Sequence, residues 1–294
     1  MKSFRLYTTL TKIGIVIFVL FATLAGYVIG FPAENHFNLN HLLMTLLGVY
    51  CLSSGSLALN QVQEYKLDQK MPRTAKRPVA SGKVTPMAAG SLALGLLISG
   101  IYLLALSSTL ALVLGLLTVI LYNGVYTYIW KPKWIYAAVP GAIPGALPVS
   151  IGYAAINENL FNSESFYLFL ILFLWQMPHF WALALRFKND YANGGVPTLP
   201  VALGMEKTLF QMGMYTLLYV GVALASPFFL HTSWVYILLV VPLSMKLLLE
   251  FRKYYRTGGE TGWFRYFMWV NASVLVYLFV PAMDKWSFLF YSGK

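Results

Sequence analysis

Apolar residues dominate nine long stretches of the chain, and polar residues gather in the segments between them. Each stretch holds about 20 mostly apolar residues, the length that an α-helix needs to cross a bilayer. The stretches cover residues 12–31, 41–60, 86–106, 108–129, 135–155, 165–186, 208–229, 232–250 and 264–282. The pattern predicts an all-α integral membrane protein, a nine-helix transmembrane bundle formed as a single domain over residues 1–294.

The composition agrees with a membrane location. Of the 294 residues, 59% are hydrophobic and 11% are charged, whereas soluble domains carry roughly 25% charged residues. The one cysteine, Cys51, lies within an apolar stretch, so the chain can form no intramolecular disulfide and no cysteine metal site. A net charge of +11 would suggest a nucleic-acid partner for a soluble protein. Here we expect contact with membrane lipid and no nucleic acid.

The Lys and Arg residues fall almost entirely on one side of the predicted bundle. If the N-terminus is cytoplasmic and the helices alternate in direction, 19 of the 21 basic residues lie in the cytoplasm, and only Lys285 and Lys294 lie outside. Such a bias marks the cytoplasmic face of membrane proteins. The 19 residues are Lys2, Arg5, Lys12, Lys66, Lys70, Arg73, Lys76, Arg77, Lys83, Lys131, Lys133, Arg186, Lys188, Lys207, Lys246, Arg252, Lys253, Arg256 and Arg265.

The two largest polar loops, residues 61–85 and 187–207, are predicted to be cytoplasmic. In the first, Asn60, Glu64 and Asp68 recur every four residues. Each step of four turns an α-helix by about 400°, so the three side chains lie within an arc of about 80°. If the helix continues to Pro72, one of its faces therefore presents an amide and two carboxylates.

Two neighbouring carboxylates repel each other unless a cation lies between them. Mg²⁺ suits this arrangement because it binds through one or two carboxylates together with substrate phosphates. Basic residues that follow could donate to further phosphate oxygens, and they include Lys70, Arg73 and Arg77. The pattern favours a magnesium-dependent diphosphate site. The alternative is a solvated helix end with local ion pairs, such as Glu64 with Lys70 or Asp68 with Lys66.

The second polar loop contains a single acid, Asp190, within a basic, Gly- and Pro-rich segment. Across the mouth of the bundle from the first loop, Asp190 could hold the other side of the diphosphate through the metal. Arg186 and Lys188 could pair with the diphosphate directly. We also expect Lys131, in the short basic segment 130–134, to bind it.

A histidine within a spanning segment is a functional candidate by default, and His179 follows Pro178 in the stretch 165–186. It could bind heme iron. The alternative is a buried histidine that bonds to a carbonyl freed by the proline. The three other histidines, His36, His41 and His231, lie near the predicted external boundary and receive no role.

Three blocks of the sequence resemble the membrane-embedded prenyltransferase superfamily of 4-hydroxybenzoate polyprenyltransferases, and one branch in particular, the protoheme IX farnesyltransferases or heme O synthases. The first block runs from Asn60 to Pro78. The second contains Tyr126, Thr127 and Lys131 and continues through Gly141, Gly145, Pro148 and Gly152. The third runs from Trp175 to Ala184, with Asp190 and the segment 196–201 after it. The resemblance covers about residues 45–210.

The resemblance implies nine helices around a central cavity that opens to the cytoplasmic side, in a bacterial plasma (inner) membrane. It implies that Mg²⁺-bound farnesyl diphosphate reacts with heme B to give heme O, which the next enzyme of heme A synthesis would receive. It also implies a substrate-binding role for Tyr126. This chain has Glu64 where the first motif usually has aspartate, and Asp190 where the second often has two aspartates.

Two other functions remain open from the sequence. One is a sister prenyltransferase for a quinone precursor or another lipophilic acceptor, against which His179 argues. The other is a transporter with a cytoplasmic anion site. Transporters usually place polar residues near the middle of the bilayer, whereas here the ionisable groups lie at one face.

Overall fold

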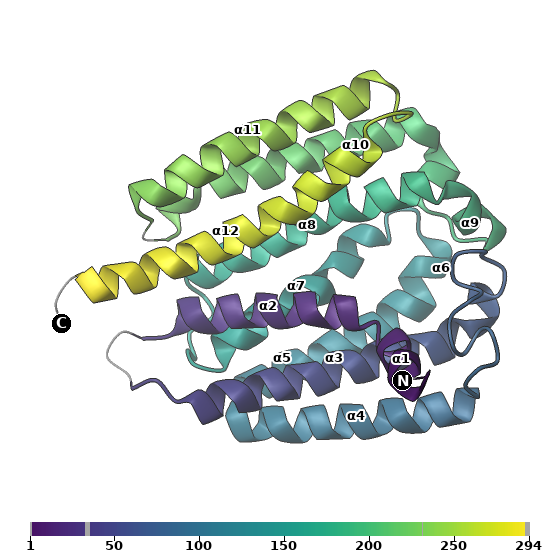
Figure 1. The fold of residues 1–294 in the computed structure, drawn as a ribbon, viewed down its shortest axis with the longest axis horizontal. Helices are drawn as coiled ribbons and strands as arrows, with labels where there is room; N and C mark the ends of the chain where they lie inside the picture. Colours follow the sequence, from purple (N-terminus) through teal and green to yellow (C-terminus); the bar gives the residue numbers. More distant parts are fainter. Residues whose placement is uncertain (1, 33–35, 231, 292–294) are drawn as a thin grey trace.

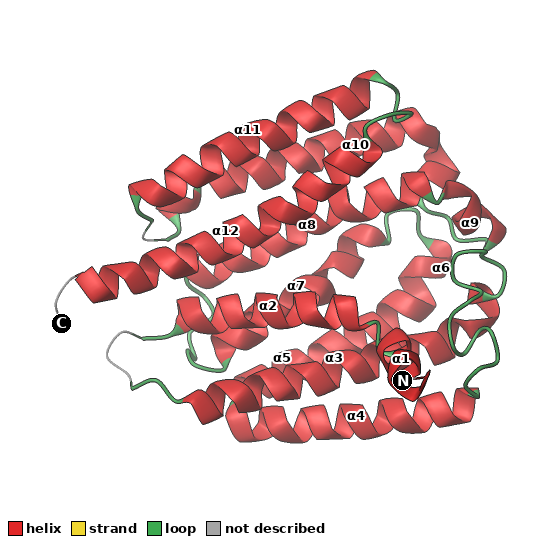
Figure 2. Ribbon diagram, viewed as in Figure 1, coloured by secondary structure: helices red, strands yellow, loops and turns green. Residues whose placement is uncertain are grey.

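The computed structural model describes residues 2–32, 36–230 and 232–291 and, over these ranges, consists of helices and loops with no strand (Figure 2). His231 and Lys294, named above, lie outside the described residues. The helices are α1 (Lys2–Leu10), α2 (Ile13–Gly30), α3 (Leu39–Asp68), α4 (Pro86–Ser107), α5 (Thr109–Val119), η1 (Ile120–Trp130), α6 (Lys131–Lys133), α7 (Ala138–Ala154), α8 (Ser163–Arg186), α9 (Lys188–Asn193), α10 (Leu199–Leu224), η2 (Ser226–Phe228), α11 (Trp234–Arg256) and α12 (Trp263–Tyr291).

The described helices bear out the all-helical membrane architecture. Seven are long and apolar enough to cross a bilayer: α2, α3, α4, α5 with its continuation to Lys133, α8, α11 and α12. The remaining two predicted stretches, 135–155 and 208–229, also form helices. However, α7 has only 17 residues, and α10 carries Glu206 and Lys207 among its apolar positions. Length and composition alone therefore support seven of the nine predicted spans.

Glycines allow helices α2 and α7 to approach each other unusually closely. A Cβ atom added at Gly26 would lie 1.9 Å from the carbonyl oxygen of Val149, and one added at Gly152 would lie 1.9 Å from that of Thr23. Small residues at helix contacts are the usual way for membrane helices to gain packing energy. This contact joins the first spanning helix to the helix that forms one wall of the cavity described below.

The stretch 108–129, expected as one regular helix, contains an 11-residue π-helix, η1. Its i→i+5 pattern is seen at its end, where the backbone N–H of Lys131 donates to the Tyr126 carbonyl, and the Thr127 hydroxyl also donates to the Tyr122 carbonyl at 2.8 Å. Asn123 ties this segment to α3: its Oδ1 accepts from Ser56 at 2.6 Å, and its Nδ2 donates to Gln63 Oε1 at 3.0 Å. Side-chain bonds to another helix thus hold the wider turn in place. π-Helical turns are rare and frequently mark functional sites.

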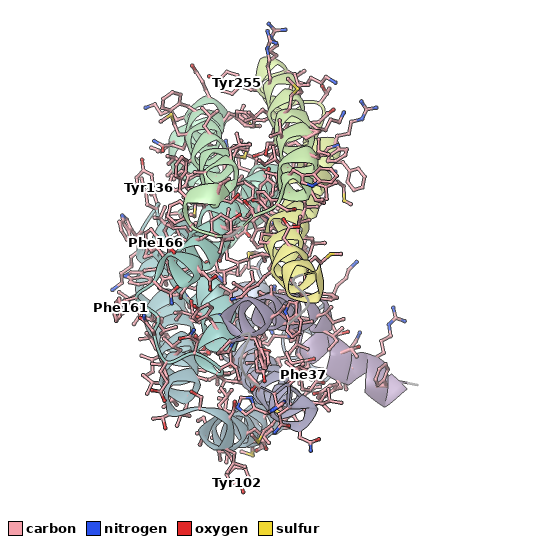
Figure 3. The ribbon with its side chains drawn as sticks, turned by 90° about the vertical axis from the view of Figure 1, so that its left-hand side faces the viewer. Phe37, Tyr102, Tyr136, Phe161, Phe166 and Tyr255 are labelled. Carbon is pink, nitrogen blue, oxygen red and sulfur yellow. The ribbon has the colours of Figure 1, made fainter. Side chains whose placement is uncertain are left out.

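One end of the bundle collects the polar loops. Figure 1 shows α6, α9 and the loop between α3 and α4 together at this end, with the C-terminus at the opposite end. Elsewhere, large apolar and aromatic side chains point outward, as Tyr102, Phe161 and Phe166 do in Figure 3. Tyr102 is 63% exposed and Phe166 is 54% exposed. Exposed apolar surface around helices of this length suits contact with lipid.

Candidate active site

A cavity of about 600 Å³ lies between α2, α3, η1, α7 and α8. Polar side chains line the end of the cavity beside α6, namely Lys12, Asn60, Glu64, Asp68, Arg73, Arg77 and Lys131. Apolar side chains line its body, among them Phe18, Leu52, Val119, Pro148 and Ile151. The cavity can therefore hold a molecule with a charged head and a long apolar tail.

Helix α3 contributes the acidic side of the polar end. Asn60, Glu64 and Asp68 are all buried and all line the cavity, on one face as their spacing predicts. The helix ends at Asp68 instead of continuing to Pro72. Pro72 has no N–H to donate to the Asp68 carbonyl, which accepts instead from the Met71 N–H at 3.2 Å and from the Thr74 hydroxyl at 3.1 Å.

Each carboxylate of α3 faces a cation that comes from another part of the chain. Arg77 Nη1 lies 2.7 Å from Asp68 Oδ1 and 2.8 Å from Asp68 Oδ2. Lys131 Nζ, at the start of α6, lies 2.5 Å from Glu64 Oε1. The site thus brings two carboxylates and two cations together at one end of the cavity.

The local ion pairs of the alternative interpretation do not form. Lys66 lies 5.9 Å from the centre of the Tyr65 ring, and Lys70 is exposed and outside the cavity. Glu64 and Asp68 are instead paired with Lys131 and Arg77. The acidic face of α3 is therefore part of the cavity and is not a solvated helix end.

Lys12 lines the polar end of the cavity, although it was not among the predicted site residues. Lys12 has φ 52° and ψ 53°, a left-handed conformation that separates α1 from α2. Its Nζ lies 3.0 Å from Asn60 Oδ1. Burial is the main cause that lowers the pKa of Lys12 to about 7, and the neighbouring Arg77 lowers it further. The available signal is a lysine at the start of the first apolar stretch, a position that also fits a cytoplasmic flanking residue.

The two polar loops meet at the mouth of the cavity. The backbone N–H of Arg73 donates to Asp190 Oδ2 at 2.9 Å, and the Arg73 guanidinium lies 4.9 Å from the centre of the Phe187 ring. Arg73 lines the cavity, as does Tyr191 of α9. Asp190 holds the first loop in place but does not itself line the cavity.

Two other predicted diphosphate ligands lie apart from the cavity. Arg186 is exposed at the end of α8, 5.8 Å from the centre of the Trp263 ring, and lines a separate pocket of about 490 Å³. Lys188 begins α9, after a break in the helix at Phe187, and does not line the cavity. The break also rotates α9 away from the course that α8 would have continued.

The π-helix places aromatic rings along the cavity wall. The rings of Tyr122 and Tyr126 stack with their centres 5.8 Å apart, and both residues line the cavity. Gly141 of α7 leaves room for Tyr126, since an added Cβ would lie 2.6 Å from the ring. The same helical segment delivers Lys131 to Glu64.

His179 lies farther along the same cavity, on α8. Its Nδ1 is 2.8 Å from Oδ1 of Asn271 on α12, and both residues line the cavity. The partner is therefore a side chain from another helix and not a carbonyl freed by Pro178. Asn271, a polar residue in the apolar stretch 264–282, was the signal that sequence reasoning missed.

The donor atoms of α3 fit Mg²⁺. Asn60, Glu64 and Asp68 offer only oxygen ligands, which this ion prefers. Within the described ranges, no three or more His, Cys, Asp and Glu side chains gather as a metal cage. Because Mg²⁺ usually retains waters and completes its shell with substrate phosphates, a site with two carboxylates suits an ion that arrives with a diphosphate.

Comparison with known proteins agrees with this geometry. Residues 19–271 match the UbiA prenyltransferase family. The chain is 62% identical over 286 residues to the protoheme IX farnesyltransferase of Bdellovibrio bacteriovorus, covering 97% of this chain and 98% of that one. It is 35% identical over 219 residues to the protoheme IX farnesyltransferase of Leptospira biflexa, covering 74% and 75%.

Solved structures share the fold. A digeranylgeranylglyceryl phosphate synthase has a TM-score of 0.76 at 17% identity, covering 96% of this chain and 100% of that one. A UbiA homologue from Archaeoglobus fulgidus, bound to GPP and Mg²⁺, has a TM-score of 0.65 at 16% identity, covering 95% and 99%. The family match and the helical fold together establish that this chain is a multi-pass membrane protein of the UbiA prenyltransferase family.

Proposed function

We propose that the protein transfers the farnesyl group of farnesyl diphosphate to a vinyl group of heme B, giving heme O and diphosphate. The observation that carries this proposal is the lining of the cavity. One end contains both carboxylates and cations, the body is apolar, and His179 lies farther along the same cavity. The 62% identity to a protoheme IX farnesyltransferase supports the choice of heme as acceptor. Heme O would then pass to the next enzyme of heme A synthesis.

At the polar end, Asn60, Glu64 and Asp68 would hold Mg²⁺ through the diphosphate, with Asp190 steadying the opposite loop. Mg²⁺ when bound supplies positive charge that neutralises the leaving diphosphate. Lys12, Arg77 and Lys131 lie beside these ligands and would turn from their present partners toward phosphate oxygens. A preorganised set of cations stabilises the negative charge that builds up as the C1–O bond breaks.

The bond changes balance without a covalent enzyme intermediate. The C1–O bond of farnesyl diphosphate breaks, and a vinyl carbon of heme forms a bond to C1. Water then adds to the resulting cation and loses a proton, which leaves a hydroxyl group. Apolar walls such as Leu52, Val119 and Ile151 would exclude bulk water until the carbon–carbon bond has formed. His179, farther along the chamber, would bind the heme iron.

The positions of the Lys and Arg residues define the membrane orientation that we propose. The polar end of the cavity includes Arg73, Arg77 and Lys131, which come from two of the basic segments between the predicted helices. The positive-inside rule puts this end and the N-terminus in the cytoplasm. We propose one membrane domain over residues 1–294, located in a bacterial plasma membrane, where heme B and a soluble diphosphate could both reach the site.

Heme extracted from cells that express the protein tests the reaction. The wild type should convert heme B into a product whose mass has increased by one farnesyl group and one hydroxyl group. Asp68→Ala should remove this product, because the variant loses a ligand and a partner of Arg77, while it still purifies folded in detergent. EDTA should stop turnover of the wild type in membranes. Heme O formation by Asp68→Ala, or in EDTA, would contradict the proposed site.

Analysis of the same extracts distinguishes the proposed reaction from the two alternative functions. A prenylated quinone precursor with unmodified heme would identify a sister prenyltransferase. Unmodified lipids together with uptake of an anion into proteoliposomes would identify a transporter. Either result would overturn the proposed reaction, although neither would change the fold.

A further inference from the structure

The ring of His179 is held from several sides. The centre of its imidazole lies 4.6 Å from that of the Trp175 ring and 4.9 Å from that of the Phe267 ring. Nδ1 faces Asn271 Oδ1 at 2.8 Å. Contacts on this many sides leave the ring little freedom to rotate about its side-chain bonds.

The helices that carry these residues are fixed against each other on both sides of the histidine. Trp175 Nε1 donates to the Val270 carbonyl at 3.1 Å, and Trp263 Nε1 donates to the Ala182 carbonyl at 2.8 Å. In the first bond α8 donates to α12, and in the second α12 donates to α8. The distance between His179 and Asn271 is therefore set by the packing of two long helices, and not by a loop.

The hydrogen bonds of Asn271 define the tautomer of His179. Asn271 Nδ2 lies 2.6 Å from the backbone oxygen of Phe267, which can only accept. The amide nitrogen must therefore point to Phe267, so that the amide oxygen points to the histidine. An amide oxygen also only accepts, so Nδ1 of His179 must carry the proton and donate it to Asn271.

This assignment leaves Nε2 with its lone pair. Nε2 makes no hydrogen bond to any residue in the described ranges, and the side chain lines the cavity. A neutral histidine that donates from one nitrogen and presents the other is the form that binds a metal ion. Residues that fix a ligand histidine in this way also raise its basicity.

We propose that Asn271 is a positioning residue, which holds His179 in its Nδ1–H tautomer so that Nε2 can bind the iron of the heme substrate. The inference rests on the proposed function, since it assumes that heme enters this cavity. It adds a residue from the last helix to a site otherwise built from α2, α3, η1, α6, α7 and α8. The farnesyl acceptor would thus be oriented by the C-terminal part of the bundle, and the diphosphate by the N-terminal part.

Ferrous heme added to the purified protein in detergent provides the test. Resonance Raman spectroscopy reports the iron–histidine stretching frequency, and an absorbance titration reports the affinity. Asn271→Leu removes the acceptor at similar volume, and it should lower the stretching frequency and weaken heme binding by about 10–100-fold. Asn271→Asp retains an acceptor, so it should keep the affinity within a few-fold of the wild type and raise the frequency.

Ser273→Ala is the matched control. Ser273 lies two residues along α12, is buried, and bonds to Tyr219 and to the Val270 carbonyl, neither of which lines the cavity, and the Trp175 bond to Val270 remains in the variant. Its loss should leave both the frequency and the heme affinity unchanged. Binding of farnesyl diphosphate to all three variants should equal that of the wild type, because none of the altered residues lies at the polar end.

The outcomes distinguish this inference from the proposed function. If the wild type shows an iron–histidine band that His179→Ala removes, while Asn271→Leu leaves the band and affinity unchanged, the positioning role is wrong and the proposed reaction stands. If His179→Ala leaves the spectrum unchanged, the histidine does not bind iron and the positioning role also fails. If the wild type binds no heme, both the inference and the proposed reaction fail.

Discussion

Asn60, Glu64 and Asp68 illustrate what residue spacing can predict. Their recurrence every four residues was sufficient to place them on one buried face, and the basic residues around them predicted an anion. The partners of Asn60 and Glu64 were not predictable, because Lys12 and Lys131 come from distant parts of the chain. Pairing across 67 residues, as between Glu64 and Lys131, depends on helix packing that local sequence does not contain.

Lys12 gives the site a dependence on pH. Burial lowers its pKa to about 7, so the free site carries this charge below pH 7 and loses it above. Binding of a diphosphate favours the charged form, and above pH 7 the protein must therefore take up a proton in order to bind. By linkage, affinity falls by at most about tenfold for each pH unit above this pKa.

Calorimetric titration with farnesyl diphosphate and Mg²⁺ at pH 6 and pH 8 checks this prediction. Lys12→Arg remains charged throughout this range and serves as the control for titration of the ligand itself. The affinity of the wild type should fall more between pH 6 and pH 8 than that of the variant. Equal changes in the two proteins would show that Lys12 does not titrate in the site.

At the scale of the element, periodicity predicted helices well but not their irregularities. The stretch 108–129 reads as one apolar helix, yet it contains the π-helix η1. Its hydrophobic pattern does not distinguish a π-helix from an α-helix. The wider turn is held by hydrogen bonds between Asn123 and α3, and such contacts between helices are not part of the local pattern. The end of α3 at Asp68 was likewise set by Thr74 and Pro72 together, and hydropathy alone could not place it.

The contact between α2 and α7 should be sensitive to a single methyl group. Gly152→Ala would place a Cβ atom 1.9 Å from the Thr23 backbone oxygen, which cannot move without shifting the helix. Overpacking of this kind costs about 1–3 kcal/mol. The thermal unfolding midpoint in detergent should therefore fall.

The matched control is Gly95→Ala on α4, where an added Cβ meets nothing within 4 Å. This change should raise stability slightly, since alanine is favoured over glycine inside helices by about 1 kcal/mol. Similar midpoints for the two variants would mean that α2 and α7 can separate at little cost.

At the scale of the whole molecule, hydropathy predicted the class of protein, and charge placement predicted that the large polar loops gather at one end (Figure 1). The arrangement of the helices around the cavity could not be derived this way, because lipid-facing and cavity-facing surfaces are both apolar. Thus Phe18 lines the cavity whereas Phe21, one turn later, is exposed on the outside of the bundle.

The lone cysteine makes the proposed orientation easy to test. In a Cys51→Ser background, Lys83→Cys places a thiol in the exposed loop between α3 and α4, and Phe161→Cys places one in the loop between α7 and α8 (Figure 3). A membrane-impermeant maleimide should label Phe161→Cys in intact spheroplasts, and Lys83→Cys only after permeabilisation. The reverse pattern would invert the topology.

The division of the cavity into a charged end and an apolar body has a consequence for turnover. The proposed reaction splits one amphiphile into two products with opposite solubility: diphosphate, which partitions into water, and a farnesylated macrocycle, which partitions into lipid. Each product would form beside side chains that match its polarity, because Arg77 and Lys131 line the charged end whereas Leu52 and Ile151 line the apolar body. If the two products leave for different phases, they do not meet again in the site, and reversal of the proposed reaction would be slow.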